Sequence, residues 1–291
     1  MRIVAVFAAL VGVATGIGWL VAGALGAVIA SAGVLLAGLS LYAGASACVL
    51  HLAGAYPMER DATPDLHRLV ERLAAQADMP GAPRLYWLPG DAPNALATGR
   101  NSTRAAIAMT PALLTFLTRD ELAGVLAREL TCIARRYTVV GDMAATLAGG
   151  LMLIASWQGR SRATAEMADP NSGGEGCRSG LWGGTGWRAV LMFIAARLAR
   201  AASSAEHVHT ADAEGARVFG DPFSVARALE RLAAANSTRP VPMVNPGLTH
   251  QFIVAPHIDE PVRPLFTAPP PLNVRLQRLT RQALRPAVNP G

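Results

Sequence analysis

The sequence predicts an α+β membrane protein in which a hydrophobic N-terminal helical hairpin precedes a domain of helices and a small, mostly antiparallel sheet. Three observations lead to this prediction. No Asp, Glu, Lys or Arg occurs from Ile3 to Leu50. Charged and polar residues return abruptly after Pro57. Short segments with the composition of strands then precede segments whose apolar residues recur at helical spacing.

The composition fits a membrane anchor joined to one folded domain. Of the 291 residues, 52% are hydrophobic and only 16% are charged, which is more apolar than most soluble proteins. The formal net charge is +6. Since arginines flank the apolar runs and no basic, aromatic platform accompanies them, we expect membrane lipid as a partner and no nucleic acid. The three cysteines show no repeated spacing, so no disulfide framework is expected.

The charge-free stretch is long enough for two membrane passes, because one spanning helix needs about 20 apolar residues. Glycines occur near its middle, where a turn would fall: Gly16, Gly18, Gly23 and Gly26. We therefore predict a transmembrane hairpin over residues 1–54 and one domain over residues 55–291. The alternative is a cleaved signal peptide ending near Ala45, but its apolar region would far exceed the usual length of about 7 to 15 residues.

The domain begins with a predicted helix, for which Thr63 supplies an N-cap and Pro64 a first-turn proline. Three short strands are predicted next, at Arg84–Leu88, Ala95–Thr98 and Ala105–Met109. The best-marked helix follows them. Its start is indicated by a capping box of Thr118 and Glu121, and its apolar side is formed by Leu122, Val125, Leu126, Leu130 and Ile133.

Two later apolar segments, 143–157 and 187–202, are each compatible with a membrane span, a core helix or an interfacial helix. The stretch 158–186 between them is rich in Gly and Ser and is predicted to be a flexible loop. A helix is then expected around Phe223–Leu232. After a proline-rich connection, a last short helix should carry Leu272, Leu276 and Leu279.

Glu129 is the first candidate for a functional residue. It lies three residues after Leu126 and four after Val125, which places a carboxylate on the apolar side of the marked helix. Burial of an unpaired carboxylate is costly, so Glu129 should have a partner or a catalytic task. An arginine such as Arg197 or Arg217 is one expected partner.

Two runs on this helix, Leu117–Leu122 and Arg128–Ile133, resemble the active-site helix of the HtpX family of membrane-bound zinc metalloproteases. In that family the helix carries H-E-x-x-H, whose histidines bind zinc while the glutamate activates the metal-bound water. The resemblance implies a zincin-like metallopeptidase domain and a multi-pass protein of the bacterial cytoplasmic membrane. It further implies that the main domain faces the cytoplasm and that the family degrades damaged membrane proteins.

Other segments resemble the family in the same order along nearly the whole chain. Pro93–Arg100 is similar to the family's P-N-A-F-A-T-G stretch. Ala211–Ala216 is similar to the end of its E-F-x-A-D segment, whose glutamate is the third zinc ligand. Pro269–Leu272 is similar to its late H-P-P-L. The joint order of these motifs is the strongest part of the resemblance.

The departures from the family fall on the zinc ligands. Arg128 and Cys132 occupy the two histidine positions and Val208 occupies that of the glutamate ligand. Arginine offers only donors and valine has no lone pair, so only Cys132 could bind a metal and no zinc cofactor is expected. Of the family's motif residues, this sequence keeps Glu129, at the general-base position, and Asp212. We hypothesise that Arg128, or another nearby arginine, takes over the compensation of Glu129 from zinc.

Two smaller differences accompany these losses. Tyr137 replaces an aspartate that is usual in the family, and Pro269 stands where a histidine is common. Glu206, His207 and His209, with Cys132, could supply a relocated metal site. This stays a minor alternative, because residues two apart on a helix face different directions.

The favoured hypothesis is a peptidase homologue without proteolytic activity that binds unfolded or membrane polypeptides. The contacts are expected along an edge strand and beside it, at Asn94, Ala105, Ala106, Ile107 and Ala108. One alternative is an active zinc metalloendopeptidase with an unusual metal site. Another is a structural membrane subunit in which packing of Arg128 closes the groove.

Overall fold

The computed structural model describes residues 2–167, 186–202, 204–238, 245–256 and 270–284, and Pro269 and Cys177 lie outside this part. The chain divides into two compact units, Met1–Ala45 and Ser46–Gly291. That the transmembrane hairpin covers residues 1–54 stays a prediction. The last turns of the first helix belong with the second unit because Val49 is buried there with Leu88 and Leu96.

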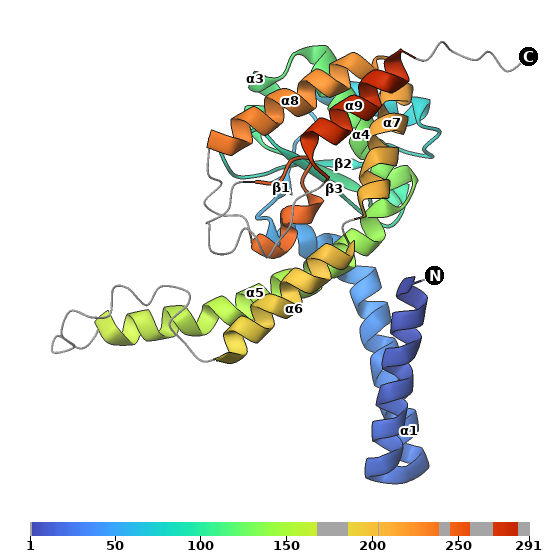
Figure 1. Ribbon diagram of the computed structural model, residues 1–291, viewed down its shortest axis with the longest axis vertical. Helices are drawn as coiled ribbons and strands as arrows, with labels where there is room; N and C mark the ends of the chain where they lie inside the picture. Colours follow the sequence, from blue (N-terminus) through green and yellow to red (C-terminus); the bar gives the residue numbers. More distant parts are fainter. Residues whose placement is uncertain (1, 168–185, 203, 239–244, 257–269, 285–291) are drawn as a thin grey trace, which may run out of the picture. The chain divides into compact units, whose positions relative to one another are not determined.

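Helix α1 spans Arg2–Leu52 and is broken at Ala22 and Gly23. Gly23 has φ +61° and ψ −145°, a conformation that residues with a side chain hardly adopt. The backbone on the two sides of the break comes close together, since a Cβ atom added at Gly18 would lie 2.3 Å from the carbonyl oxygen of Gly26. Figure 1 shows the two legs of α1 side by side. The break occurs where the glycines predicted a turn.

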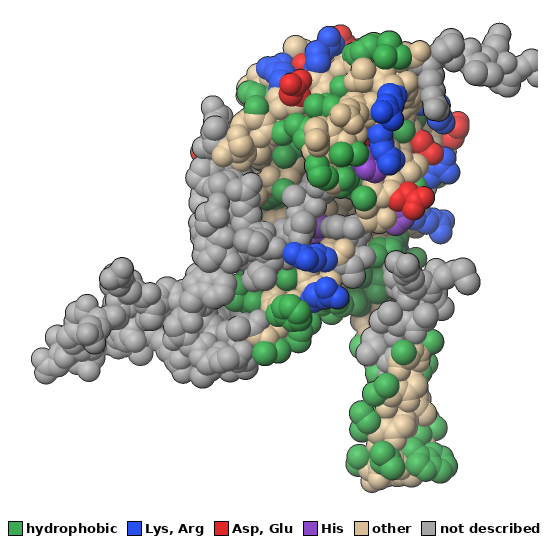
Figure 2. Space-filling view, viewed as in Figure 1, with side chains coloured by type: hydrophobic (Ala, Val, Ile, Leu, Met, Phe, Trp, Pro, Cys, Tyr) green, Lys and Arg blue, Asp and Glu red, His purple; other side chains and the backbone are tan. Residues whose placement is uncertain are grey.

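Large apolar side chains cover the outside of α1, and Leu20 and Val21 at the break are 85% and 80% exposed. Figure 2 shows hydrophobic side chains along both legs. Of the helices in the described part of the chain, α1 alone is long and apolar enough to cross a membrane, over Val11–Leu52. The apolar part of α5, Tyr137–Leu153, is shorter. That α1 crosses the membrane twice stays a prediction.

The second unit contains a mixed sheet in the order β1-β2-β4-β3. Its strands are β1 (Tyr56–Pro57), β2 (Arg84–Trp87), β3 (Ala95–Thr98) and β4 (Ala106–Met109). The β1–β2 and β3–β4 pairs are antiparallel and the central β2–β4 pair is parallel. The three predicted strands are therefore confirmed to within a residue, whereas β1 was not predicted.

The prediction that Ala105–Met109 forms an edge of the sheet is wrong. Strand β4 pairs with β2 on one side and with β3 on the other, and all its residues are buried. The sheet has β1 at one edge and β3 at the other, and β3 returns antiparallel along β4 to form the edge on that side. Part of this edge is itself covered, because Phe252 bridges to Leu96 and the Ile253 amide donates to the Ala95 carbonyl at 3.1 Å.

The remaining helices have the following bounds: α2 Pro64–Gln76, α3 Pro111–Phe116, α4 Arg119–Ala134, α5 Tyr137–Met167, α6 Gly186–Ala202, α7 Ala205–Phe219, α8 Pro222–Thr238 and α9 Leu272–Ala283. Short 3-10 turns occur at Ser102–Arg104 and Pro246–Gln251. Helix α4 contacts β3, α2, α7 and α8 and is the centre of the domain (Figure 1). Its predicted capping box of Thr118 and Glu121 is confirmed.

The predicted flexible loop over 158–186 is wrong for its described part. Helix α5 continues to Met167, and α6 begins at Gly186. Residues 168–185 lie outside the described part. The extension of α5 has a simple cause, since Ala, Arg, Glu and Met are good helix formers and together outweigh the single glycine and the single serine there. Helices α5 and α6 pack on each other through buried residues such as Ala148, Met152 and Ala195.

Gly215 sets the distance between α7 and α4, because a Cβ atom at this position would lie 2.5 Å from the Cα atom of Arg128. We expect Gly215→Ala to lower the free energy of unfolding by about 1 to 3 kcal/mol, since backbone must shift to admit the methyl group. Urea unfolding measures this loss. Gly150→Ala on α5 is the matched control, because nothing lies within 4 Å of its added Cβ; equal stability of the two variants would contradict the prediction.

Candidate functional site

Four buried charged residues meet where α4, α7 and α9 come together: Arg128, Glu129, Asp212 and Arg275. We call this group the four-charge cluster. Helix α4 supplies the first two residues, α7 supplies Asp212 and α9 supplies Arg275. Glu129 is 1% exposed and Arg128 is 7% exposed. Two guanidinium groups and two carboxylates give a formal charge of zero, which makes their joint burial tolerable.

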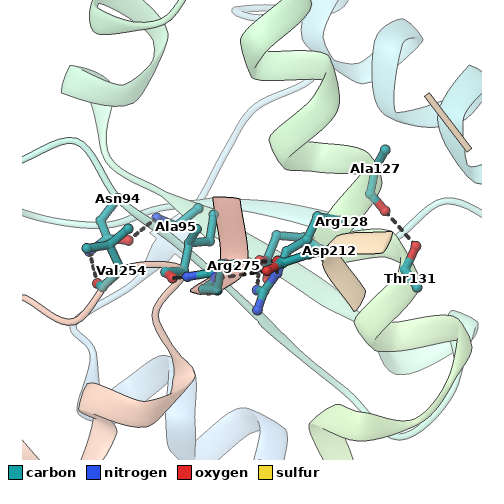
Figure 3. Close-up of polar contacts among 10 residues, drawn as sticks. Asn94, Ala95, Ala127, Arg128, Thr131, Asp212, Val254 and Arg275 are labelled. Carbon is teal, nitrogen blue, oxygen red and sulfur yellow. Dashed lines mark hydrogen bonds and ion pairs between the residues drawn. The ribbon is translucent and has the colours of Figure 1, made fainter. Parts of the chain in front are cut away.

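The contacts within the cluster are direct. Arg275 donates from Nε and Nη2 to the two oxygens of Asp212, at 2.7 and 2.8 Å, and from Nη1 to the Ile253 carbonyl at 3.0 Å. Arg128 donates from Nη1 to Glu129 and from Nε to Asp212 at 3.4 Å. Figure 3 shows Arg128 and Arg275 converging on Asp212. Each carboxylate therefore has an arginine partner.

These contacts decide between the expected partners of Glu129. The ion pair is formed by Arg128, as hypothesised, while Arg197 and Arg217 are exposed. Sequence reasoning missed Arg275. A signal for it exists, because this arginine follows Leu272 by three residues and precedes Leu279 by four, so it lies on the apolar side of α9.

Burial governs the protonation of the site. It raises the pKa of Glu129, although Arg128 opposes this effect. Burial also raises the pKa of the Cys132 thiol to about 12, so the sulfur stays protonated at neutral pH. For Arg128 burial acts to lower the pKa, but the acidic groups of Cys132, Glu129 and Asp212 raise it on balance. The arginine is therefore a permanent cation.

The residues present do not fit a zinc ion. The guanidinium of Arg128 offers only donors, Val208 offers none of the lone pairs that a metal needs, and a protonated thiol is a poor ligand. In the part of the chain that the structure describes, no three His, Cys, Asp or Glu side chains are grouped so that they could hold a metal. His207 stacks on Tyr137 with ring centroids 4.3 Å apart. His207, one of the histidines considered for a relocated metal site, is therefore already packed against an aromatic ring.

A cavity of about 220 Å³ lies beside the four-charge cluster. Its wall includes Arg128, Glu129, Cys132 and Val208, so the four residues that the resemblance predicts at the catalytic and ligand positions face the same space. Ala97 of β3, His207 of α7 and His250 also line it. The packing of Arg128 therefore leaves room beside it for a ligand.

The residues predicted to contact substrate are not brought to this cavity. Ala105, Ala106, Ile107 and Ala108 are buried inside the sheet. Asn94 is 2% exposed, and its side chain makes hydrogen bonds within the domain. Nδ2 donates to the Val254 carbonyl at 2.7 Å and Oδ1 accepts from the Ala95 amide. Asn94 thus holds the segment that covers the edge of β3.

Asp142 is a second buried carboxylate that sequence reasoning missed. It is 1% exposed and accepts hydrogen bonds from the Gly99 amide at 2.8 Å, Gln251 Nε2 at 3.1 Å and the Ser46 hydroxyl at 3.3 Å. These donors come from the end of β3, the segment covering β3 and the end of α1. Burial raises the pKa of Asp142 to about 6, although its hydrogen bonds oppose the shift.

The raised pKa of Asp142 predicts a pH-dependent stability. The folded state holds the proton more tightly than the unfolded state, so the free energy of unfolding should fall by up to about 3 kcal/mol as the pH rises from about 4 through about 6. Asp142→Asn should lose this part of the pH dependence in urea unfolding, and the exposed control Asp91→Asn should keep it. A wild-type profile identical to that of Asp142→Asn would refute the assignment.

Comparisons with known proteins agree with the motifs on α4 and α7. The model of peptidase family M48 matches residues 60–283. A protease HtpX homologue of Syntrophobacter fumaroxidans is 37% identical over 281 residues, covering 96% of this chain and 97% of the relative. Those of Pyrococcus furiosus and Persephonella marina are each 35% identical, over 94% and 95% of this chain and 93% and 96% of their own lengths.

Proposed function

The chain belongs to peptidase family M48 as a homologue of the HtpX proteases, and from this premise we propose that it does not hydrolyse peptide bonds but binds polypeptide at a membrane. The single observation that carries the proposal is the pairing of the Arg128 guanidinium with Glu129 in a buried, charge-balanced cluster. The Arg128 guanidinium thus lies beside the Glu129 carboxylate, which would otherwise be free to accept a proton from water.

The loss of hydrolysis follows from what each group can do. Zinc lowers the pKa of a bound water and polarises the carbonyl under attack. A guanidinium binds no water as a Lewis acid would, and it cannot be deprotonated at neutral pH. Glu129 keeps its place but accepts a hydrogen bond from Arg128, which competes with any water for the carboxylate. The site thus lacks both the electrophile and a free base.

A binding role is favoured over that of a purely structural subunit by the cavity. If Arg128 served only to close the groove, its side chain would fill the space, yet about 220 Å³ remains beside it. The polypeptide is expected to enter this cavity and not to add to β4, which is paired on both sides.

The membrane assignment rests on α1. Its apolar length, the break at Gly23 and the close approach of Gly18 to Gly26 support two passes with both ends on one side. We propose a multi-pass protein of the cytoplasmic membrane, with lipid as a partner of α1 and the peptidase-like domain in the cytoplasm.

A cleavage assay tests the proposal. The detergent-purified chain is incubated with casein and with an unfolded membrane protein, each with and without a chelator. No cleavage above that of a Glu129→Gln variant is expected. Chelator-sensitive cleavage that Glu129→Gln abolishes would instead establish an active metalloendopeptidase.

A further inference from the structure

The turn between the two legs of α1 carries large apolar side chains that the chain itself does not cover. Leu20, Val21 and Leu25 are all exposed there. Figure 2 shows hydrophobic side chains gathered around this turn. Within residues 17–30 the Trp19 indole is the only side-chain group that can form a hydrogen bond. A turn of this composition is unfavourable in water, because it would expose a contiguous apolar surface.

The backbone of the same turn has the opposite requirement. Ala22 and Gly23 leave the helical conformation, so carbonyls at the end of the first leg and amides at the start of the second leg have no partners within the helix. Apart from the Trp19 indole, no side chain near the turn can supply such partners. Because an unpartnered backbone group is very costly in hydrocarbon, these groups must reach lipid headgroups or water.

The length of the second leg places the turn where both requirements are met. At about 1.5 Å per helical residue, the stretch from Gly23 to Tyr42 is about 28 Å long, and the hydrocarbon core of a bilayer is about 30 Å thick. Trp19 and Tyr42 are both exposed, and these two residue types are enriched at the membrane interfaces. Between the two levels, the Thr15 and Ser31 hydroxyls donate to carbonyls of their own helix at 2.7 and 2.8 Å, so neither needs water.

We infer that the turn of α1 is a lipid-binding element that lies at the headgroup boundary of the far leaflet. Leu20 and Val21 face the acyl chains, and the free backbone groups around Gly23 face the headgroups. The inference rests on the proposed membrane role of α1 and deepens it, because it fixes the depth of the turn and names the region of the lipid that binds it. The turn therefore neither extends into the water on the far side nor stops inside the hydrocarbon.

Spin labelling of the full-length chain in phospholipid vesicles measures this depth. The three native cysteines are replaced by alanine, and a nitroxide label is attached to one new cysteine at a time. Val21→Cys reports on the turn, Leu35→Cys on the exposed face of the second leg, and Leu284→Cys on an exposed site at the end of α9. For each label, accessibility to oxygen, which concentrates in hydrocarbon, is compared with accessibility to a water-soluble nickel complex.

The label at Val21 should lie within about 10 Å of the headgroup boundary, so it should be less accessible to nickel than the label at Leu284 and less accessible to oxygen than the label at Leu35. Leu35 follows Gly23 by about 18 Å along the second leg, which places it near the bilayer centre. Should Val21→Cys not fold, Leu20→Cys reports the same depth.

The other outcomes separate the inference from the proposed function. Equal nickel accessibility at Val21 and Leu284 would show a turn in water, and equal oxygen accessibility at Val21 and Leu35 would show a submerged turn; either result overturns the inference. Broadening between labels at Val21 that disappears on dilution with unlabelled chain would assign the turn to a second copy and would also overturn it. If Leu35 is as accessible to nickel as Leu284, α1 does not lie in the bilayer and its proposed membrane role itself fails.

Discussion

Replacing Arg275 with methionine should lower the free energy of unfolding by about 3 to 5 kcal/mol, because it leaves the Asp212 carboxylate buried with too little compensation. Arg275 is 2% exposed and donates to both oxygens of Asp212 and to the Ile253 carbonyl. The hydrogen bond that remains to Asp212 comes from Arg128 Nε and is long, at 3.4 Å. The same guanidinium group also pairs with Glu129.

Urea unfolding of the detergent-solubilised chain measures this loss. Arg281→Met removes an arginine from the exposed face of the same helix and should cost less than about 0.5 kcal/mol. The double variant Arg275→Met with Asp212→Leu should be less destabilised than the sum of the two single variants, because it removes a charge-balanced pair. Additive losses, or a loss below about 1 kcal/mol for Arg275→Met, would show that the ion pair of Arg275 and Asp212 does not stabilise the fold.

Introducing the ligand set that the resemblance assigns to the HtpX family should create a zinc site. The substitutions are Arg128→His, Cys132→His and Val208→Glu, and all three positions line the same cavity next to Glu129. Two imidazoles and a carboxylate supply the three protein ligands that a catalytic zinc ion requires. Asp212 keeps its bidentate partner Arg275 in this variant, so the cluster loses one cation and the metal replaces it.

Elemental analysis after incubation with zinc and gel filtration measures the gain. The triple variant should retain about one equivalent of zinc. A matched variant with Arg128→His and Cys132→His but with Val208 unchanged should retain much less, because the third ligand is missing. If the triple variant folds and retains no zinc, the three positions do not face one site and the comparison with the family's motif is misplaced.

Local sequence signals predicted the framework of the site well. Thr118 and Glu121 mark the start of α4, and the apolar spacing along that helix places Glu129 inside the domain. That Arg128 and Val208 offer no lone pair to a metal could also be read directly, because it depends only on the atoms of the side chains. That these residues stand at ligand positions of the family stays a prediction.

The pairing of strands could not be read in the same way. The run Ala106–Met109 is apolar throughout, which indicates burial on both faces, but its two neighbours are set by connections that a local pattern does not encode. For the same reason the partners of Asp142 were missed. Its donors, at Gly99, Gln251 and Ser46, come from three distant parts of the chain.

The most direct test of the proposal that Arg128 takes the place of zinc is the metal content of the wild-type chain, purified in detergent, incubated with zinc and separated from free metal. Because Arg128 and Val208 provide no lone pair for a cation, we expect no retained zinc. One tightly held equivalent that disappears on Glu129→Gln or Cys132→Ala would contradict the proposal.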